Sequence, residues 1–265
     1  MPLISVIMGV HNSRPDLFQK AVNSILSQTE KDFEFLICDD GSDDKTKQML
    51  KETALTDSRI KIITLPRNEG LAVALNKCLD IAKGRFIARQ DDDDYSNISR
   101  FEKQIEFLNE NADIDFIGTA CELFDSTMTV YGERVMPKSI DKKSFLYNSP
   151  FIHGSMMFRK EVFSDNRYRT IGKMKRYEDY DLFMTLTAKG YRSANMEDKL
   201  YSFYFEPTAR KISFAMRKDE YKVRMEGFKK LGLMPKGFFY ALKPLILGLI
   251  PHKLFLTLKK KHGGM

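Results

Sequence analysis

The sequence has no tryptophan and only three cysteines among its 265 residues. Cys38, Cys78 and Cys121 stand far apart in apolar segments, without the close spacing of metal ligands. An odd number of such cysteines is typical of free thiols buried in a reducing compartment. No basic, cleavable leader precedes the first apolar segment, residues 3–8. We therefore expect a cytoplasmic protein whose cysteines are structural.

Two glycine-rich phosphate loops are also missing. The sequence contains no Gly-x-x-x-x-Gly-Lys-Ser/Thr motif, which excludes a P-loop nucleotide site. No Gly-x-Gly-x-x-Gly follows the first apolar segment, which argues against a dinucleotide-binding fold. A diphosphate bound by this chain would therefore be held through a metal ion rather than by a glycine cradle.

No stretch of about 20 uninterrupted apolar residues is present, although the C-terminal tail comes nearest. Residues 238–258 are rich in Leu, Ile and Phe, but Lys243, Pro244 and Pro251 interrupt them, and lysines occupy 259–261. This pattern predicts one or two helices lying in a membrane interface, with residues 236–261 meeting anionic lipid. The alternative is that these helices pack on the rest of the chain or on a second subunit, as in a homo-oligomer.

Charge is divided unevenly along the chain. The formal net charge is +7, yet residues 210–265 hold 14 Lys and Arg against three Asp and Glu, which leaves residues 1–209 with −4. A basic tail suits an anionic surface. Because apolar residues are interleaved with the lysines, the tail favours lipid over nucleic acid, and we expect no nucleic-acid partner.

Apolar segments alternate with helical patterns through the first half of the chain, which predicts a largely parallel sheet covered by helices on both faces. Ser42 or Asp43 is expected to cap the second helix, and Gly84 to end the third. In the second half the patterns predict a hairpin, a short buried strand, a helix and a last strand. The expected strands are 3–10, 33–38, 60–64, 86–88, 114–119, 155–158 and 200–205, the hairpin is 121–135, and the helices are 17–26, 43–50, 69–82, 101–108 and 178–188.

Three acidic clusters carry the chemistry. The run Asp91-Asp92-Asp93-Asp94 follows an apolar segment, where four repelling carboxylates are relieved by a divalent cation or by solvent. Asp39-Asp40-Gly41-Ser42 follows an earlier strand, where it serves either as a ligand site or as a capped turn. Parallel strands end at one edge of a sheet, so both clusters should lie beside Val10-His11-Asn12. The third cluster begins with Glu178-Asp179, which is either a general base or a favourable first helical turn.

These segments together resemble a family 2 glycosyltransferase, over about residues 1–205. The resemblance rests on the order and separation of several motifs: Val10-His11-Asn12, Asp39-Asp40-Gly41-Ser42, Asn68-Glu69-Gly70-Leu71 with Asn76, the segment 84–94, and Glu178-Asp179. That family has a GT-A (Rossmann-like) fold and transfers a sugar from a nucleotide-sugar donor, usually with inversion. The resemblance implies a catalytic domain over 1–209, with a nucleotide-sugar half at 1–120 and an acceptor-side half at 121–209. The composition of the tail predicts an amphipathic helical extension at 210–265.

The resemblance also implies roles for individual residues. Asp40 would bind a uracil-like base with Asp39 in support, and Asp91 or Asp92 would contact the ribose. Asp93, with Asp91, would hold Mn²⁺ or Mg²⁺ on the diphosphate. Asp179 would be the catalytic base beside Glu178. Further donor contacts would come from Val10, His11, Asn12, Asn68, Asn76 and Arg89, and His153 would line the acceptor side; Asp94 would be only a turn residue near a helix.

The sequence departs from the family pattern at the first strand, where Gly9-Val10-His11 replaces the usual Pro or Thr, variable residue and Tyr. The missing tryptophan removes the Gln-x-x-Arg-Trp motif of processive synthases, which favours transfer of a single sugar. We expect an inverting, metal-dependent enzyme that uses a UDP-sugar and acts on a glycan or lipid-linked acceptor of bacterial-type surface polysaccharide, at the inner face of the membrane. The alternatives are a sugar nucleotidyltransferase and a receiver-like Mg²⁺-binding signalling domain.

Overall fold

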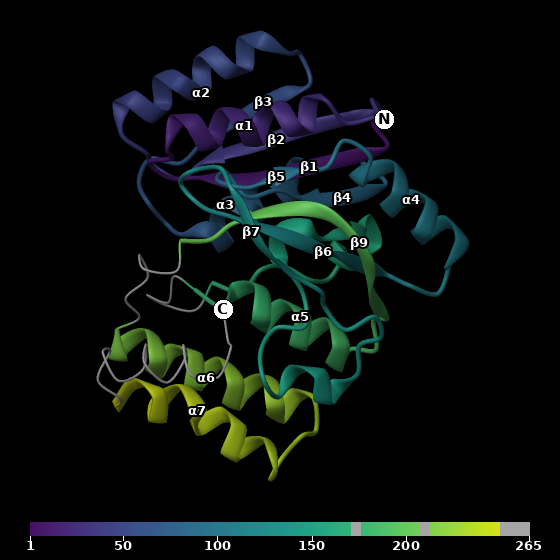
Figure 1. Cartoon of the computed structure of the whole chain (residues 1–265), viewed down its shortest axis with the longest axis vertical. Coiled ribbons are helices and arrows are strands. Elements are labelled where there is room, and N and C mark those ends of the chain that lie inside the picture. The colour runs from purple at the N-terminus through teal and green to yellow at the C-terminus, as the bar shows by residue number, and fades with distance from the viewer. Residues whose placement is uncertain (171–175, 207–212, 250–265) are drawn as a thin grey trace.

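The structure is a computed structural model, and it describes residues 1–170, 176–206 and 213–249. A nine-stranded sheet runs through the middle of the molecule, with helices on both of its faces (Figure 1). The strands follow the order β3-β2-β1-β4-β8-β6-β9-β5, and β7 pairs with β6 beside this path. The fold is α/β with a largely parallel central sheet, as the sequence predicts.

The strands and helices have the following bounds. The strands are β1 Ile4–Val10, β2 Phe33–Asp39, β3 Ile60–Thr64, β4 Phe86–Arg89, β5 Tyr95–Ser96, β6 Phe116–Phe124, β7 Val130–Arg134, β8 Met157–Arg159 and β9 Ser193–Tyr204. The helices are α1 Pro15–Leu26, α2 Asp44–Thr56, α3 Leu71–Ile81, α4 Arg100–Glu110, α5 Glu178–Ala188, α6 Phe214–Lys230 and α7 Gly237–Leu249, with short 3₁₀ turns at Lys142–Phe145, His153–Ser155 and Lys160–Phe163.

The strands β3, β2, β1 and β4 are parallel neighbours, so their carboxyl ends meet at one edge of the sheet. Val10 pairs with Asp39 at that edge, and Arg89 pairs with Ile7, which lies three residues before Val10 in β1. Every residue of β1, β2 and β4 is buried, because helices cover both faces. The polar residues that follow these strands are thereby brought to one place, as the alternating pattern predicts.

Two hydrophobic cores lie on opposite faces of the sheet. One joins β1 and β2 to α1, α2 and α4. The other joins the sheet to α3, α5, α6 and α7, and its members from the last two helices are Val223, Phe228 and Ala241. Figure 1 shows α5, α6 and α7 stacked below the sheet. The first part of the tail therefore packs on the catalytic body.

Arg224 of α6 fixes this attachment. Its buried guanidinium pairs with Glu220 and donates hydrogen bonds to the carbonyl oxygens of Leu146 and Tyr147, at 3.1 and 3.0 Å. The predicted boundary between residues 209 and 210 stays a prediction, but α6 shares one core with the sheet. The predicted helical stretch beyond residue 249 lies outside the described residues.

Several elements differ from their predicted extent. The strand expected at 114–119 begins at Phe116 and continues to Phe124, so it supplies the first arm of the predicted hairpin. The last strand starts at Ser193, because β9 pairs along nearly the whole of β6. Asp43 caps α2 by accepting a hydrogen bond from the Thr46 backbone, as expected. The three cysteines are free and buried, which confirms the structural prediction.

The prediction that Gly84 ends the third helix is wrong. It does not end α3, which stops at Ile81 and continues into extended backbone at Ala82. Instead, a Cβ atom on Gly84 would lie 2.3 Å from the backbone nitrogen of Ser5. The glycine is required because the chain passes directly against β1, a contact between distant segments that a helix pattern does not reveal.

Candidate active site

Two pockets open at the edge where the parallel strands end. The first, here called the β1 pocket, has a volume of about 520 Å³. It contains five of the predicted donor-binding residues, from four separate segments, together with the start of α3. Its lining residues are Gly9, Val10, His11, Asp40, Asn68, Gly70, Leu71, Ala74 and Asp92.

The second pocket, here called the α5 pocket, has a volume of about 650 Å³. It brings the predicted base Asp179 together with Asp91 and His153, which come from three distant parts of the chain. The rest of its lining is Arg134, Met136, Asn148, Ser149, Phe151, Ile152, Gly154 and Phe203. Asp91 and Asp92 are adjacent in sequence but line different pockets, so the acidic turn at residues 91–94 lies between the two.

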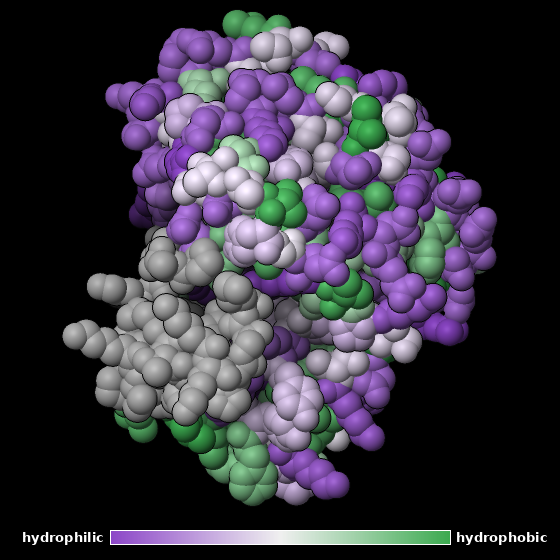
Figure 2. All heavy atoms as spheres, viewed as in Figure 1, coloured by the Kyte–Doolittle hydropathy of each residue, from purple (hydrophilic) through white to green (hydrophobic). Residues whose placement is uncertain are grey.

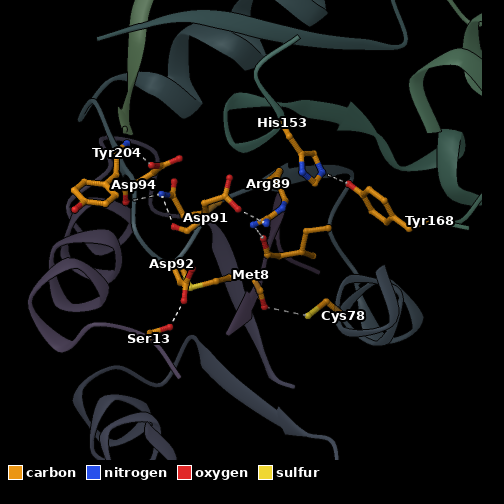
Figure 3. Close-up of polar contacts among 12 residues, drawn as sticks. Met8, Ser13, Cys78, Arg89, Asp91, Asp92, Asp94, His153, Tyr168 and Tyr204 are labelled. Atoms are coloured by element: carbon orange, nitrogen blue, oxygen red, sulfur yellow. Dashed lines mark hydrogen bonds and ion pairs between the residues drawn. The ribbon is translucent and has the colours of Figure 1, made fainter. Parts of the chain in front are cut away.

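Arg89 anchors the start of this acidic turn. Its side chain is completely buried and donates from Nη2 to the Asp91 carboxylate at 2.5 Å. Figure 3 shows Arg89 between Asp91 and His153, and Arg89 is not among the residues that line either pocket. In the described structure Arg89 therefore acts by holding the Asp91 carboxylate in position. A direct donor contact from Arg89 stays a prediction.

A buried polar network supports the turn from below. Arg100 of α4 donates hydrogen bonds to Gln90, Ser96 and the carbonyl oxygen of Arg89. Gln104, four residues later on α4, accepts from Arg100 and donates to the carbonyl oxygen of Ser155. Burial lowers the pKa of Arg100 to about 10, which leaves it charged at neutral pH. This network fixes the backbone on both sides of the acidic turn.

Asp92 and Asp94 have different partners. Asp92 accepts a hydrogen bond from Ser13, and burial raises its pKa to about 6. The sequence predicts that Asp94 is only a turn residue near a helix, and this prediction is wrong. Asp94 is buried and accepts a hydrogen bond from the backbone nitrogen of Tyr204 in β9 at 2.6 Å (Figure 3). Burial and the nearby charges of Asp93 and Asp91 raise the pKa of Asp94 well above its usual range. Asp94 thus joins the turn to the second half of the sheet.

The Asp39-Asp40 pair is held by backbone groups. Asp39 accepts a hydrogen bond from the Ser42 nitrogen at 2.9 Å, which closes the turn before α2. Asp40 accepts from the nitrogens of Glu69 and Gly70 at 2.7 and 2.9 Å, which ties this turn to the start of α3. Gly41 has φ of +64°, and a Cβ there would lie 2.2 Å from the backbone of Arg67. Asp40 also lines the β1 pocket, and its contact with a nucleobase stays a prediction.

His11 lines the rim of the β1 pocket, and Asn12 follows it in the same turn without lining the pocket. His11 donates from Nδ1 to the carbonyl oxygen of Asp40 at 3.0 Å, which leaves Nε2 as the acceptor in the neutral ring. Asn12 adopts a left-handed backbone with φ of 52° and accepts from the Asp43 nitrogen. The rim is thus fixed to the cap of α2, and the His11 ring stays exposed at the pocket.

The carboxylates of α5 lie in its first turn, after Tyr177 in a left-handed conformation with φ of 71°. That conformation costs free energy for a residue other than glycine, and such strain is often found at functional sites. Burial, and then the charge of Asp179, raise the pKa of Glu178 to about 7. Burial and the charge of Asp91 also raise the pKa of Asp179. Of the two, Asp179 lines the α5 pocket.

His153 is held in place by a chain of hydrogen bonds. Its Nε2 atom lies 2.9 Å from the Tyr168 hydroxyl. Both polar groups of Asn76 bond the backbone of Tyr168, at 2.8 and 3.0 Å, so Asn76 positions Tyr168. Burial and the charge of Arg89 lower the pKa of His153 well below its usual range, so the ring is neutral at pH 7. A nucleotide contact from Asn76 stays a prediction, because it lines neither pocket.

The donor set suits a hard divalent cation. Among the described residues no group of three or more His, Cys, Asp or Glu side chains is arranged to hold a metal. Mg²⁺ commonly takes only one or two carboxylates and completes its shell with substrate phosphates and water. Asp91 lies at the α5 pocket with one of its oxygens on Arg89, and Asp93 follows two residues later in the same turn. The carboxylate chemistry of Asp91 and Asp93 suits a cation that arrives with a diphosphate, and joint ligation by these two residues stays a prediction.

Four residues of this region were not predicted as site residues: Ser13, Arg100, Tyr168 and Arg134. Ser13 immediately follows the predicted Asn12, so the sequence held a signal for it. Tyr168 lies in a segment without a recognisable pattern, and Arg134 lies in the predicted hairpin, whose pattern does not show what its last residues face. Only the folded chain brings Arg134 to the α5 pocket and Tyr168 to His153. Arg100 reads as an ordinary charged residue at a helix start, and its burial follows from the way α4 packs.

The raised pKa of Glu178 predicts how stability depends on pH without a divalent cation. Between pH 4.5 and about 7 the folded protein keeps a proton that the unfolded chain has released. The free energy of unfolding should therefore decrease as the pH rises through this window. Urea unfolding of the wild type and of Glu178→Gln at several pH values measures the effect. The free energy of unfolding should decrease less with pH in the variant than in the wild type. Identical slopes of this free energy against pH for the two proteins would refute the prediction.

The sheet order, the two pockets at the carboxyl ends of the parallel strands and the acidic turn between them define a GT-A nucleotide-sugar glycosyltransferase. Residues 5–167 match the family model described as "Glycosyl transferase family 2". The chain belongs to this family. Membership decides against the receiver-like domain and the sugar nucleotidyltransferase.

Three relatives show which proteins this chain is similar to. It is 35% identical over 253 residues to EpsE of Bacillus subtilis, a protein classed as a glycosyltransferase. The alignment covers 94% of this chain and 90% of EpsE. It is 35% identical over 190 residues to the O-antigen biosynthesis glycosyltransferase WbnJ of Escherichia coli, covering 70% and 72%. It is 29% identical over 251 residues, covering 93% and 95%, to WfaP of Escherichia coli, a UDP-Glc:alpha-D-GlcNAc-diphosphoundecaprenol beta-1,3-glucosyltransferase.

Solved structures agree on the fold. S. aureus TarS in complex with UDP-GlcNAc superposes with a TM-score of 0.69 at 20% identity, covering 93% of this chain and 71% of that one. The mannosyltransferase PcManGT of Pyrobaculum calidifontis, in complex with GDP-Man and Mn²⁺, gives 0.64 at 16% identity, covering 99% and 80%. At these identities the likeness concerns the fold alone.

Proposed function

We propose that this enzyme transfers one sugar, with inversion, from a UDP-sugar to a hydroxyl group of a glycan or lipid-linked acceptor in surface polysaccharide assembly. One observation carries the proposal: Asp179 and Asp91, from opposite halves of the fold, line one pocket, and Asp92 leads directly into the neighbouring pocket that holds Asp40. A donor whose base lies in the β1 pocket would cross the acidic turn with its diphosphate. Its sugar would then reach the α5 pocket.

In this arrangement Asp179 takes the proton of the acceptor hydroxyl as the new bond to the anomeric carbon forms. The acceptor attacks from the face opposite the nucleotide, which inverts the configuration. A raised pKa brings the base closer to neutral pH, where proton transfer is efficient. His153 is neutral and hydrogen-bonded to Tyr168, so it is suited to orient an acceptor hydroxyl rather than to act as an acid.

Asp91 and Asp93 would hold the Mn²⁺ or Mg²⁺, which supplies Lewis-acid stabilisation of the leaving diphosphate. Arg89 keeps the Asp91 carboxylate in place through their buried ion pair. On the donor side, Asp40 accepts the N–H group of the base, with Asp39 closing the turn behind it and Val10, His11, Asn12 and Asn68 around it.

A thermal-shift panel of nucleotide sugars tests the donor class. A ligand at 100 times its Kd adds about 2.7 kcal/mol to the free energy of unfolding. A UDP-sugar with Mn²⁺ should raise the melting temperature, and the rise should vanish with EDTA. Equal shifts with GDP, CDP and dTDP sugars would contradict the assignment of the base. No shift with any nucleotide sugar would count against the proposed donor.

A lipid-linked acceptor places the enzyme at a membrane surface, and α7 has the side chains for this contact. No helix among the residues that the structure describes has the length and apolar character to span a bilayer. The face of α7 that packs inward carries small residues, with Gly237, Ala241 and Pro244 buried. The large side chains Phe239, Ile246 and Leu249 remain exposed, and Figure 2 shows hydrophobic surface along the lower edge, where α7 lies in Figure 1.

Flotation with anionic liposomes tests this location. The triple variant Phe239→Ser, Ile246→Ser, Leu249→Ser keeps the small residues that face α6, so the packing of the helix is preserved. We expect the wild type to float with the vesicles and the variant to stay in the lower fractions. Because the tail is basic, neutral vesicles should bind the wild type less. Equal recovery of both proteins with the anionic vesicles would exclude this face as the membrane contact.

A further inference from the structure

Arg134 has no role in the proposed chemistry, yet it is the one Lys or Arg among the described residues that line the α5 pocket. It ends β7 and shares the pocket with Asp91 and Asp179. The pocket's histidine, His153, is neutral at pH 7. Arg134 is therefore the positive charge of this pocket.

Two aromatic rings hold the guanidinium. Its central carbon lies 5.4 Å from the ring centroid of Phe203 and 5.0 Å from that of Phe205. The Tyr131 hydroxyl donates to the carbonyl oxygen of Phe205 at 2.7 Å, which ties β7 to the end of β9. These side chains belong to a small hydrophobic cluster with Ile152 and Tyr201. Arg134 is an exposed residue whose guanidinium thus lies over a packed aromatic platform.

No carboxylate among the described residues pairs with Arg134. Its neighbour Glu133 pairs with Lys199. Of the two carboxylates in the pocket, Asp91 pairs with Arg89, and Asp179 is the proposed base. An arginine held in this way offers a planar fork of donors to an anionic oxygen group, which Arg binds with two parallel hydrogen bonds.

We propose that the acceptor carries an anionic oxygen group, a phosphate or a carboxylate, next to its reacting sugar, and that Arg134 binds this group. The inference rests on the proposed function, because it is Asp179 that makes the α5 pocket the acceptor side. The apolar lining of Met136, Phe151 and Phe203 supplies a face for the sugar ring or for the first carbons of a lipid.

Two acceptors have this chemistry: a sugar on a lipid diphosphate, and an acidic sugar. Farnesyl diphosphate is the probe for the first source, and hexyl glucuronide is the probe for the second. Each is titrated into the protein with Mn²⁺ and the nucleotide of the best donor present in excess, so that the metal and the β1 pocket are already occupied. The variants are Arg134→Ala, Arg134→Lys and a matched control, Arg85→Ala. Arg85 also stacks on a phenylalanine, Phe86, but at the start of β4, on the opposite edge of the sheet.

We expect at least one acidic probe to bind about tenfold more weakly to Arg134→Ala, a change of about 1.4 kcal/mol, with partial recovery in Arg134→Lys. Arg85→Ala should bind like the wild type. Dependence on Arg134 for farnesyl diphosphate identifies the lipid diphosphate, and dependence for hexyl glucuronide identifies an acidic sugar. Failure of both probes to bind, or equal binding to the wild type and Arg134→Ala, would overturn the inference.

Parallel nucleotide titrations distinguish failure of the proposed function from failure of the role assigned to Arg134. Absence of nucleotide binding in the wild type counts against the proposed function. Normal nucleotide binding together with probe binding that ignores Arg134 counts against this inference alone. A loss of nucleotide affinity in Arg134→Ala would place Arg134 on the donor and would also overturn its assignment to the acceptor.

Discussion

Replacing Asp179 by asparagine is expected to lower kcat by 10²–10⁴-fold, the usual contribution of a general base. Asparagine keeps the shape of the side chain but cannot accept the proton of the acceptor hydroxyl. The Kd of the nucleotide donor should change little, because Asp179 lines the α5 pocket and not the β1 pocket. Steady-state kinetics together with a donor titration on the same preparation measure both quantities.

Glu178→Gln is the matched control for Asp179→Asn. Both carboxylates open α5, and burial raises the pKa of each, but only Asp179 is among the residues lining the α5 pocket. The Glu178 variant should keep kcat within about tenfold of the wild type. If Glu178→Gln lost as much activity as Asp179→Asn, the base would not be Asp179 alone. Normal turnover by Asp179→Asn would remove it from the mechanism.

Asp91→Ala is expected to have the largest effect on stability, about 3–5 kcal/mol in the free energy of unfolding. Arg89 is completely buried, and its ion pair with Asp91 is the one recorded for it among the described residues. Removing the carboxylate leaves an uncompensated buried charge. The same substitution should abolish Mn²⁺-dependent donor binding. Urea unfolding and a nucleotide-sugar titration with Mn²⁺ measure the two losses.

A double variant separates these losses. Arg89→Met combined with Asp91→Ala removes both charges, so it should recover much of the stability without recovering metal-dependent binding. Non-additivity of the single and double variants then gives the coupling between the two residues. Asp93→Ala should also lose metal-dependent binding. If the double variant bound the donor with Mn²⁺ as the wild type does, Asp91 would have no part in holding the metal.

Much of the active-site frame was predictable because it depends on periodicity and on chain order. Alternating strands and helices force the segments after β1, β2 and β4 to one edge, so the neighbourhood of Asp40 and the acidic turn followed from the sequence. The position of Asp94 did not follow. Its hydrogen bond to Tyr204 depends on β9 returning beside the turn, and local sequence carries no signal for that.

The sequence by itself determined the fold class, the family and the order of the three acidic clusters, because hydrophobic period and motif spacing are local properties of the chain. Tertiary structure alone decided how four adjacent aspartates divide their tasks. Asp91 lies on a buried arginine at the α5 pocket, Asp92 enters the β1 pocket, and Asp94 is sealed against β9. It also decided that Arg134 and Asp179 line the same pocket. Such contacts join residues distant in sequence, and the packing of the whole sheet fixes them.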